Sequence, residues 1–202
     1  MRIAWPLLLL LASASPAATV RVTDSVANAV AEANAGDTVL IEGPAAFHER
    51  ILVDKPLRLV GTNSPVVDAG GSGTPLTIRS TNVFVSGLIF RQGGCDLGKP
   101  DSGVMIDAAF VHVENCSVEG GAFGIYLHGA NDCRVENNSV VGNTNLPPAQ
   151  RGNGIHLWNS KRNAIVGNSI TDTRDGAYFS YADGNLIASN RFVNNKAAVH
   201  LW

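Results

Sequence analysis

Two short patterns define this chain: Gly154-Ile-His-Leu157 and, after it, Ile165-Val-Gly-Asn168-Ser-Ile170. The same two patterns recur 22 residues later, as Gly176-Ala-Tyr-Phe179 and Ile187-Ala-Ser-Asn190-Arg-Phe192. Each pattern alternates apolar residues over a short stretch, which is the period of a β-strand. The chain is therefore built on an internal repeat of several short strands.

Earlier copies of both patterns show that the repeat is real. Gly124-Ile-Tyr-Leu127 and Val135-Glu-Asn-Asn138-Ser-Val140 each precede their next copy by 30 residues rather than 22. Both patterns shift together, so the extra residues form a loop around 143–151. A second insertion, at 92–102, contains Cys95.

A coil of about 22 residues with several short strands is typical of a solenoid. We predict an all-β fold, a right-handed single-stranded parallel β-helix of the pectate-lyase type, over residues 19–202. Thr23 or Asp24 is expected to cap a short helix that contains Val26 and Val30 and ends at Ala35-Gly36. This helix would cover the first coil, before a strand at 37–41. The last coil ends in mid-repeat at Trp202, so we expect an open C-terminal end and a truncated chain.

Stacked coils lie about 4.8 Å apart, so equivalent residues form columns along the axis. Asparagine suits tight turns, and stacked amides hydrogen-bond along such an axis. Two structural asparagine ladders are predicted: Asn138, Asn168 and Asn190 in one, and Asn163 and Asn185 in the other. Cys116 and Cys133 fall in different ladders, too far apart for a disulfide, and are predicted to be buried thiols. Cys95 is expected to be free.

Outward-facing columns form the candidate site. If Ile125 and Leu127 point inward, the residues between and beside them point outward. One outward column reads Met105, Tyr126, His156, Tyr178, His200, and the next reads Asp107, His128, Trp158, Ser180, Trp202. An exposed aromatic stripe favours a binding surface, for a protein partner, a sugar face or a metal held by imidazoles. The alternative is a ladder of stacked aromatic side chains that only strengthens the sheet. The predicted partner-binding residues are Tyr126, His156, Trp158, Tyr178, His200 and Trp202.

The N-terminus and the overall charge bear on location and partners. Residues 1–18 combine a positive start, an apolar run too short to span a bilayer and a small-residue region, which predicts a secretory signal peptide and a periplasmic location. No membrane span is expected after its cleavage. With 202 residues, 45% hydrophobic, and a formal charge of −2, the chain is a globular protein unsuited to nucleic acid.

Three strings carry a family resemblance: residues 123–130, residues 174–180 and, most specifically, Arg151-Gly-Asn-Gly-Ile-His-Leu-Trp-Asn159. They resemble NosD, a periplasmic β-helix family. Residues 51–91 resemble the wider group of carbohydrate-binding and sugar-hydrolase β-helices. The NosD resemblance implies an accessory role beside an ABC transporter, in supplying copper to nitrous oxide reductase or assembling its copper site. It covers an N-terminal portion of the longer family members.

Copper is the cofactor to consider, as a transient rather than a firmly bound ion. Copper(I) accepts imidazole and sulfur ligands. Among the outward residues His128 and His156 lie on a diagonal of about 8 Å, just within reach of converging side chains. They are the predicted metal ligands. His48 and His112 stand alone and are expected to be solvated.

The alternative function is a carbohydrate-binding or polysaccharide-cleaving β-helix. Cleavage needs clustered carboxylates with basic groups. The best cluster is Asp172, Asp175 and Asp183, but Arg174 is expected to form ion pairs with it in a turn. We therefore expect no catalytic residues and a protein that is not an enzyme.

Overall fold

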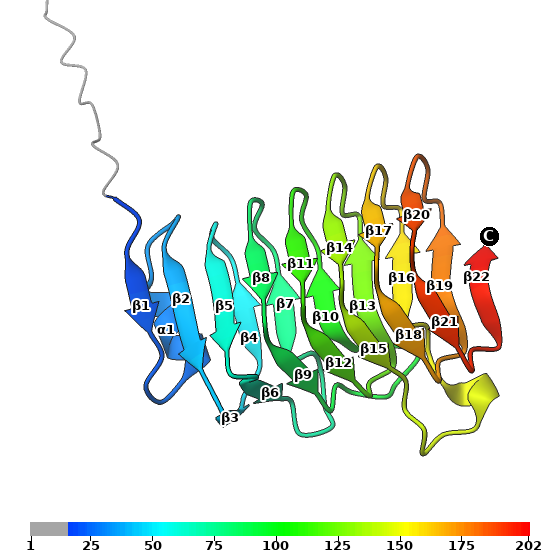
Figure 1. Ribbon diagram of the computed structural model, residues 1–202, viewed down its shortest axis with the longest axis horizontal. Helices are drawn as coiled ribbons and strands as arrows, with labels where there is room; N and C mark the ends of the chain where they lie inside the picture. Colours follow the sequence, from blue (N-terminus) through cyan, green and yellow to red (C-terminus); the bar gives the residue numbers. More distant parts are fainter. Residues whose placement is uncertain (1–15) are drawn as a thin grey trace, which may run out of the picture.

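The computed structural model describes residues 16–202, which form a stack of coils along one long axis (Figure 1). Three parallel sheets run along the stack. The eight-stranded sheet contains β1 (Thr19–Arg21), β2 (Thr38–Glu42), β5 (Arg58–Thr62), β8 (Phe84–Ser86), β11 (His112–Glu114), β14 (Arg134–Glu136), β17 (Ala164–Val166) and β20 (Leu186–Ala188).

The other two sheets have seven strands each. One contains β4 (Ile51–Val53), β7 (Leu76–Ile78), β10 (Ser102–Ile106), β13 (Phe123–His128), β16 (Ile155–Trp158), β19 (Asp175–Ser180) and β22 (Ala197–Leu201). The other contains β3 (Ala46–His48), β6 (Val66–Asp68), β9 (Ile89–Arg91), β12 (Ser117–Glu119), β15 (Ser139–Val141), β18 (Ser169–Thr171) and β21 (Arg191–Val193). Every strand pairs in parallel with its equivalent in the next coil, which confirms the predicted β-helix.

The core consists of the inward-facing residue of each short strand. Val113 of β11, Val135 of β14 and Ile165 of β17 share one register and are fully buried. The glycine that opens each Gly-apolar-x-apolar pattern also faces this interior. A Cβ on Gly124 would overlap the side chain of Val140 and the carbonyl oxygen of Gly154, so no larger residue fits there. The pattern is therefore a packing requirement of the coil.

Both predicted asparagine ladders are present. The Oδ1 atom of Asn168 accepts from the backbone N–H of Asn138 at 2.9 Å and from its Nδ2 at 3.0 Å. Asn190 and Asn168 repeat this arrangement one coil later. In the second ladder Asn163 donates in the same way to Asn185. A further contact between two successive coils was not predicted: the backbone N–H and the hydroxyl of Thr173 both donate to the Oδ1 of Asn195.

The cysteines occupy the positions that the register predicts. The backbone N–H of Cys116 donates to Asn138 and that of Cys133 donates to Asn163. All three thiols are free, with Cys95 exposed and the other two buried. Burial raises the pKa of Cys116 to about 12 and that of Cys133 to about 11. These two thiols are therefore inert packing groups.

The N-terminal end differs in detail from the expectation. Helix α1 (Val26–Glu32) covers the first coils, but its N-cap is Ser25, whose hydroxyl accepts from the N–H of Asn28. Glu49 takes the N–H groups of Val26 and Ala27, so Thr23 and Asp24 are not needed as caps. Strand β1, which precedes the helix and pairs with β2, was not predicted.

The predicted signal peptide lies almost entirely outside the described residues. Of residues 1–18 only the last three are described, and Ala18 already exchanges hydrogen bonds with Asp37 and Thr38. Within residues 16–202 no helix is long and apolar enough to cross a bilayer.

The ladder predicts a large and specific loss of stability on Asn168→Ala. The change removes the acceptor used by Asn138 and the donor used by the carbonyls of Val135 and Val166, all well inside the turn. Leaving buried polar groups unpaired costs about 1–3 kcal/mol each, so we expect the free energy of unfolding to fall by about 3 kcal/mol or more in urea titrations. Asn145→Ala, at an exposed loop position, is the control and should change it by less than about 0.5 kcal/mol. Equal losses in the two variants would contradict a structural role for the ladder.

Candidate functional site

The first outward column forms as the sequence predicts. Tyr126 of β13 pairs with His156 of β16, which pairs with Tyr178 of β19, which pairs with His200 of β22. The ring centroids of successive members lie 4.6, 4.9 and 4.8 Å apart. These four side chains, from residues up to 74 positions apart in the sequence, thus make one continuous stack.

The stack is less exposed than its outward direction suggests. Tyr126 is only 8% exposed, because Phe123 packs against it with ring centroids 5.3 Å apart and His156 covers another side. Phe123 also meets the His156 ring edge-on at 4.9 Å. It was not singled out from the sequence.

The accessible aromatic surface comes from the second column. Trp158 is 39% exposed and lies in register with Ser180, but the neighbouring Tyr181 supplies the next ring. Tyr181 has a positive φ of 52°, is 62% exposed, and its ring lies 6.5 Å from Trp158 and 5.9 Å from Trp202. Ser180 is in register with Trp158, as predicted, but the exposed ring beside Trp158 is that of Tyr181. We call Tyr126, His156, Trp158, Tyr178 and Tyr181 the aromatic face.

His156 is held as a neutral imidazole within this face. Its Nδ1 lies 3.0 Å from the Nδ2 of Asn153, which can only donate, so Nδ1 accepts and the ring proton belongs on Nε2. Arg174 in turn donates to the Oδ1 of Asn153. Burial and then the charge of Arg174 lower the pKa of His156 to about 4, while Asp175 acts in the opposite direction.

The predicted copper ligands do not share a free site. The Nδ1 of His128 lies 3.1 Å from Asp107, and the Nδ1 of His156 is used by Asn153. The ring of Tyr126 contacts both histidines, with centroid distances of 5.9 and 4.6 Å. Copper binding by this pair remains a prediction.

The carboxylates considered for catalysis are paired with cations. Asp175, 4% exposed, lies 3.3 Å from both Arg174 and the Nδ1 of His200. Asp172 lies 3.7 Å from Arg151, and Asp183 lies 2.9 Å from Lys161. The predicted ion pair of Arg174 with this cluster is present.

A groove runs beside the aromatic face, over β4, β7, β10 and β13. Its volume is about 540 Å³, and Arg50 and Arg79 line it together with Asp101, Tyr126 and His128. It therefore brings two arginines and two aspartates, Asp101 and Asp107, next to aromatic rings, with Arg79 4.0 Å from Asp107. The sequence did not predict this groove.

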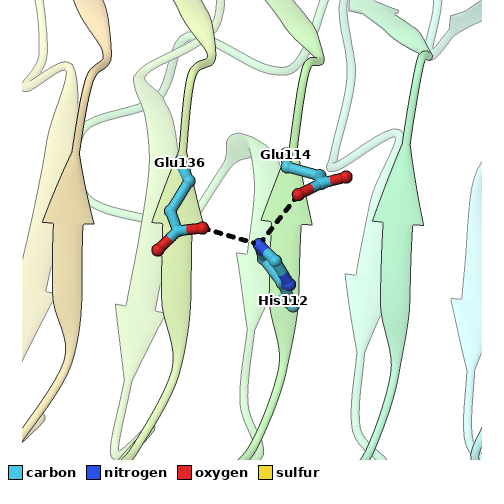
Figure 2. A group of neighbouring side chains, drawn as sticks. All are labelled: His112, Glu114 and Glu136. Atoms are coloured by element: carbon cyan, nitrogen blue, oxygen red, sulfur yellow. Dashed lines mark ion pairs between the residues drawn. The ribbon is translucent and has the colours of Figure 1, made fainter.

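One expectation about histidines is wrong. His48 is exposed, as expected, but His112 is not a solitary solvated residue. Its Nε2 lies 3.2 Å from Glu114 and 3.1 Å from Glu136, as Figure 2 shows. These three residues are the group in residues 16–202 whose ligand atoms are close enough to hold one metal ion. The repeated Val-Glu-Asn of residues 113–115 and 135–137 places two glutamates one coil apart, and His112 directly precedes the first copy. This is the sequence signal from which the cluster could have been predicted.

The lowered pKa of His156 predicts an acid-sensitive contribution to stability. The unfolded chain takes up a proton near pH 6.5 but the folded chain only near pH 4, so acid favours unfolding as the pH falls through this window. Between pH 7.5 and 4.5 wild-type protein should lose about 2–3 kcal/mol more than His156→Gln, as measured by urea unfolding at each pH. His48→Gln, the control, should follow the wild type. Parallel pH profiles for wild type and His156→Gln would show that His156 is not held neutral.

Comparisons with known proteins agree with this architecture. Residues 71–201 match the family model described as the right handed beta helix region. An alginate lyase from Paenibacillus sp. superposes with a TM-score of 0.74 at 16% identity, covering 87% of this chain and 66% of the lyase. The Dettilon tailspike protein superposes with a TM-score of 0.57 at 13% identity, covering 84% of this chain and 41% of the tailspike. At these identities the likeness concerns the fold alone.

Two curated relatives are also similar in sequence. Both are named "Probable ABC transporter binding protein NosD". The protein from Pseudomonas aeruginosa is 31% identical over 127 residues, and that from Stutzerimonas stutzeri is 29% identical over 132 residues. The matches cover 62% and 64% of this chain but 30% of each relative, so the chain spans about a third of their length. The chain is thus NosD-like in sequence, and it belongs to the right-handed β-helix family.

Proposed function

We propose that this protein is a non-enzymatic, periplasmic accessory factor that docks protein partners through its aromatic face during maturation of nitrous oxide reductase. The partners would be subunits of an ABC transporter and the reductase itself. The names of the two relatives support the transporter, and the family resemblance supports the reductase.

The observation that carries the proposal is the aromatic face. Protein interfaces are enriched in tyrosine and tryptophan, which bring large contact areas at low conformational cost. Here Trp158 and Tyr181 are exposed at the edge of a stack whose inner members, Tyr126 and His156, are fixed by their neighbours. Such a surface is rigid before a partner arrives, which lowers the entropic cost of docking.

The charges around the stack support binding rather than catalysis. His156 is neutral, and the neighbouring Asp175 is ion-paired with Arg174. Copper would be the cargo of this process, and we propose that it contacts His128 and His156 only transiently, with further ligands supplied by a partner.

A second candidate function is the binding of acidic carbohydrates, which the groove favours. Arg50 and Arg79 offer charges for carboxylate groups, and Tyr126 and His128 offer rings beside them. This second function shares Tyr126 and His128 with the first, but it depends on Arg50 and Arg79, which the first does not use. Variants of the arginines and variants of Trp158 and Tyr181 therefore separate the two.

The proposal predicts that Trp158→Ala combined with Tyr181→Ala disables the factor without unfolding it. Both rings are substantially exposed, and losing two interface aromatics weakens docking by about 30-fold or more. In source cells carrying this double variant, exported nitrous oxide reductase should contain as little copper as in cells lacking the gene. The control is Leu186→Ala, an equally exposed apolar residue on β20 of another sheet, which should leave the copper content unchanged.

A fully metallated and active reductase in cells lacking the gene would contradict the proposal. If, in addition, the purified protein bound uronate oligosaccharides, and Arg79→Gln abolished that binding while the aromatic double variant did not, the carbohydrate function would replace it.

A further inference from the structure

The His112, Glu114 and Glu136 side chains converge on one point of the eight-stranded sheet, away from the aromatic face. His112 and Glu114 begin and end β11, so they point to the same side, while Val113 between them points into the core. Glu136 of β14 is in register with Glu114. The histidine therefore faces two carboxylates, one on its own strand and one on the next coil (Figure 2).

The geometry leaves this nitrogen without a proper partner. His112 Nε2 is buried and forms no hydrogen bond of acceptable geometry, although Glu114 Oε2 is 3.2 Å away and Glu136 Oε2 is 3.1 Å away. A ring N–H on Nε2 would meet neither carboxylate at a favourable angle. If Nε2 instead carries its lone pair, three electron-rich atoms face one another. The arrangement calls for a positive charge at its centre.

The spacing of the donor atoms suits a metal ion. Zinc binds histidine nitrogen at about 2.0–2.1 Å and carboxylate oxygen at about 2.0–2.2 Å, so neighbouring ligand atoms around one ion lie about 3.0–3.5 Å apart. The two histidine–carboxylate distances fall in this range, and the three ligand atoms lie within 4.8 Å of one another. Two carboxylates would also balance the charge of a divalent ion.

The set of ligands selects among metals. One imidazole with two carboxylates suits a divalent ion of intermediate hardness, whereas copper(I) prefers sulfur and calcium prefers six to eight oxygens. We propose that His112, Glu114 and Glu136 form a binding site for a divalent transition-metal ion, with Zn²⁺ as its representative.

The surroundings hold the ligands in place. Arg134 donates to Oε1 of Glu136 at 3.2 Å, which fixes that carboxylate and leaves its Oε2 for the ion. On the other side, the Phe84 ring meets the His112 ring edge-on at 5.4 Å. Ordered neighbours of this kind are what a metal site requires.

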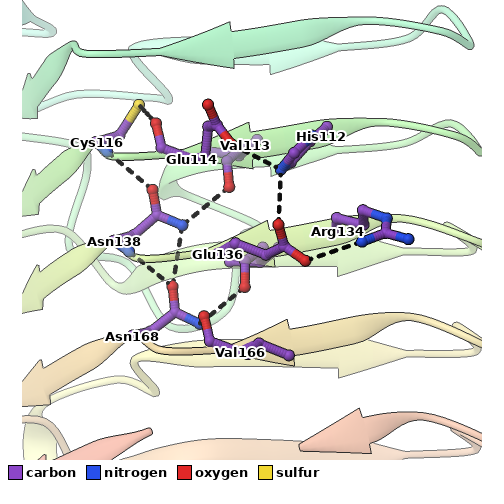
Figure 3. A network of polar contacts seen from close by, with 10 residues as sticks. His112, Val113, Glu114, Cys116, Arg134, Glu136, Asn138, Val166 and Asn168 are labelled. Atoms are coloured by element: carbon purple, nitrogen blue, oxygen red, sulfur yellow. Dashed lines mark hydrogen bonds and ion pairs between the residues drawn. The ribbon is translucent and has the colours of Figure 1, made fainter. Parts of the chain in front are cut away.

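The asparagine ladder secures the backbone directly behind the site, as Figure 3 shows. Asn138 receives the N–H of Cys116 at 3.0 Å and donates to the carbonyl of Val113 at 3.0 Å. The thiol of Cys116 donates to the carbonyl of Glu114 at 3.2 Å. The strands that carry the two glutamates are thus locked in register, and a bound ion would link β11 to β14 as a clamp between successive coils.

The test is calorimetric titration of the purified, tag-free protein with ZnCl₂. The background is Cys95→Ser, because Cys95 is an exposed free thiol and thiolates are typical zinc ligands. One Zn²⁺ per chain should bind, and Glu136→Gln, which keeps the shape and removes the charge, should weaken binding about tenfold or more. The melting temperature should rise with Zn²⁺ in the parent and not in Glu136→Gln, since an ion that binds only the folded state stabilises it.

Two matched variants make the result specific. Glu119→Gln, on β12 of another sheet and paired with Arg91, should bind zinc like the parent. His112→Gln should lose binding as Glu136→Gln does. The proposal is overturned if the parent neither binds Zn²⁺ nor gains thermal stability at 1 mM ZnCl₂, or if Glu136→Gln and His112→Gln bind as tightly as the parent.

Discussion

The parallel register between successive coils is the constraint on which the rest of the molecule depends. Backbone hydrogen bonds align the strands, and the asparagine ladders repeat that alignment in the turns, where the Oδ1 of Asn168 takes both the N–H and the side-chain amide of Asn138. A slip of one residue would turn every core residue outward. The hydrogen bonds between strands and those between turns therefore specify the same register.

This register explains how a chain of repeated short strands builds two separate candidate sites. Side chains spaced by one coil become neighbours, so Tyr126, His156 and Tyr178 form a stack on one sheet. On another sheet the same rule brings Glu114 and Glu136 around His112. The first site is apolar and suited to docking, whereas the second is polar and suited to an ion. Because the sheets face different directions, the two can act independently.

The sequence predicted what depends on the repeat alone. The ladders, the buried thiols of Cys116 and Cys133 and the column from Met105 to His200 all follow from counting residues within a coil. Features that depart from this regular spacing were not predicted. Tyr181 takes the place expected for Ser180 because a positive φ turns the chain at the strand end.

Other features depend on contacts that periodicity does not describe. Glu49, which lies beyond the first strand, satisfies the start of helix α1 together with Ser25, so the cap was placed too early. The His112 cluster does not follow from the columns, because His112 is in register with Arg134 and reaches Glu136 only along a diagonal between coils. The groove was also not predicted, because the sequence alone does not show that Arg50 and Arg79 lie on the same face of the first coils.

The most direct measurement of the coil register is the distance between spin labels placed far apart in one column. Arg58→Cys on β5 and Leu186→Cys on β20, in the Cys95→Ser background, put labels on exposed positions five coils apart, while Cys116 and Cys133 stay buried. At about 4.8 Å per coil, pulsed electron paramagnetic resonance should give a single narrow distribution near 24 Å, broadened only by the label linkers. A broad distribution, or a centre displaced by more than two coil spacings, would contradict the stacked register and with it both candidate sites.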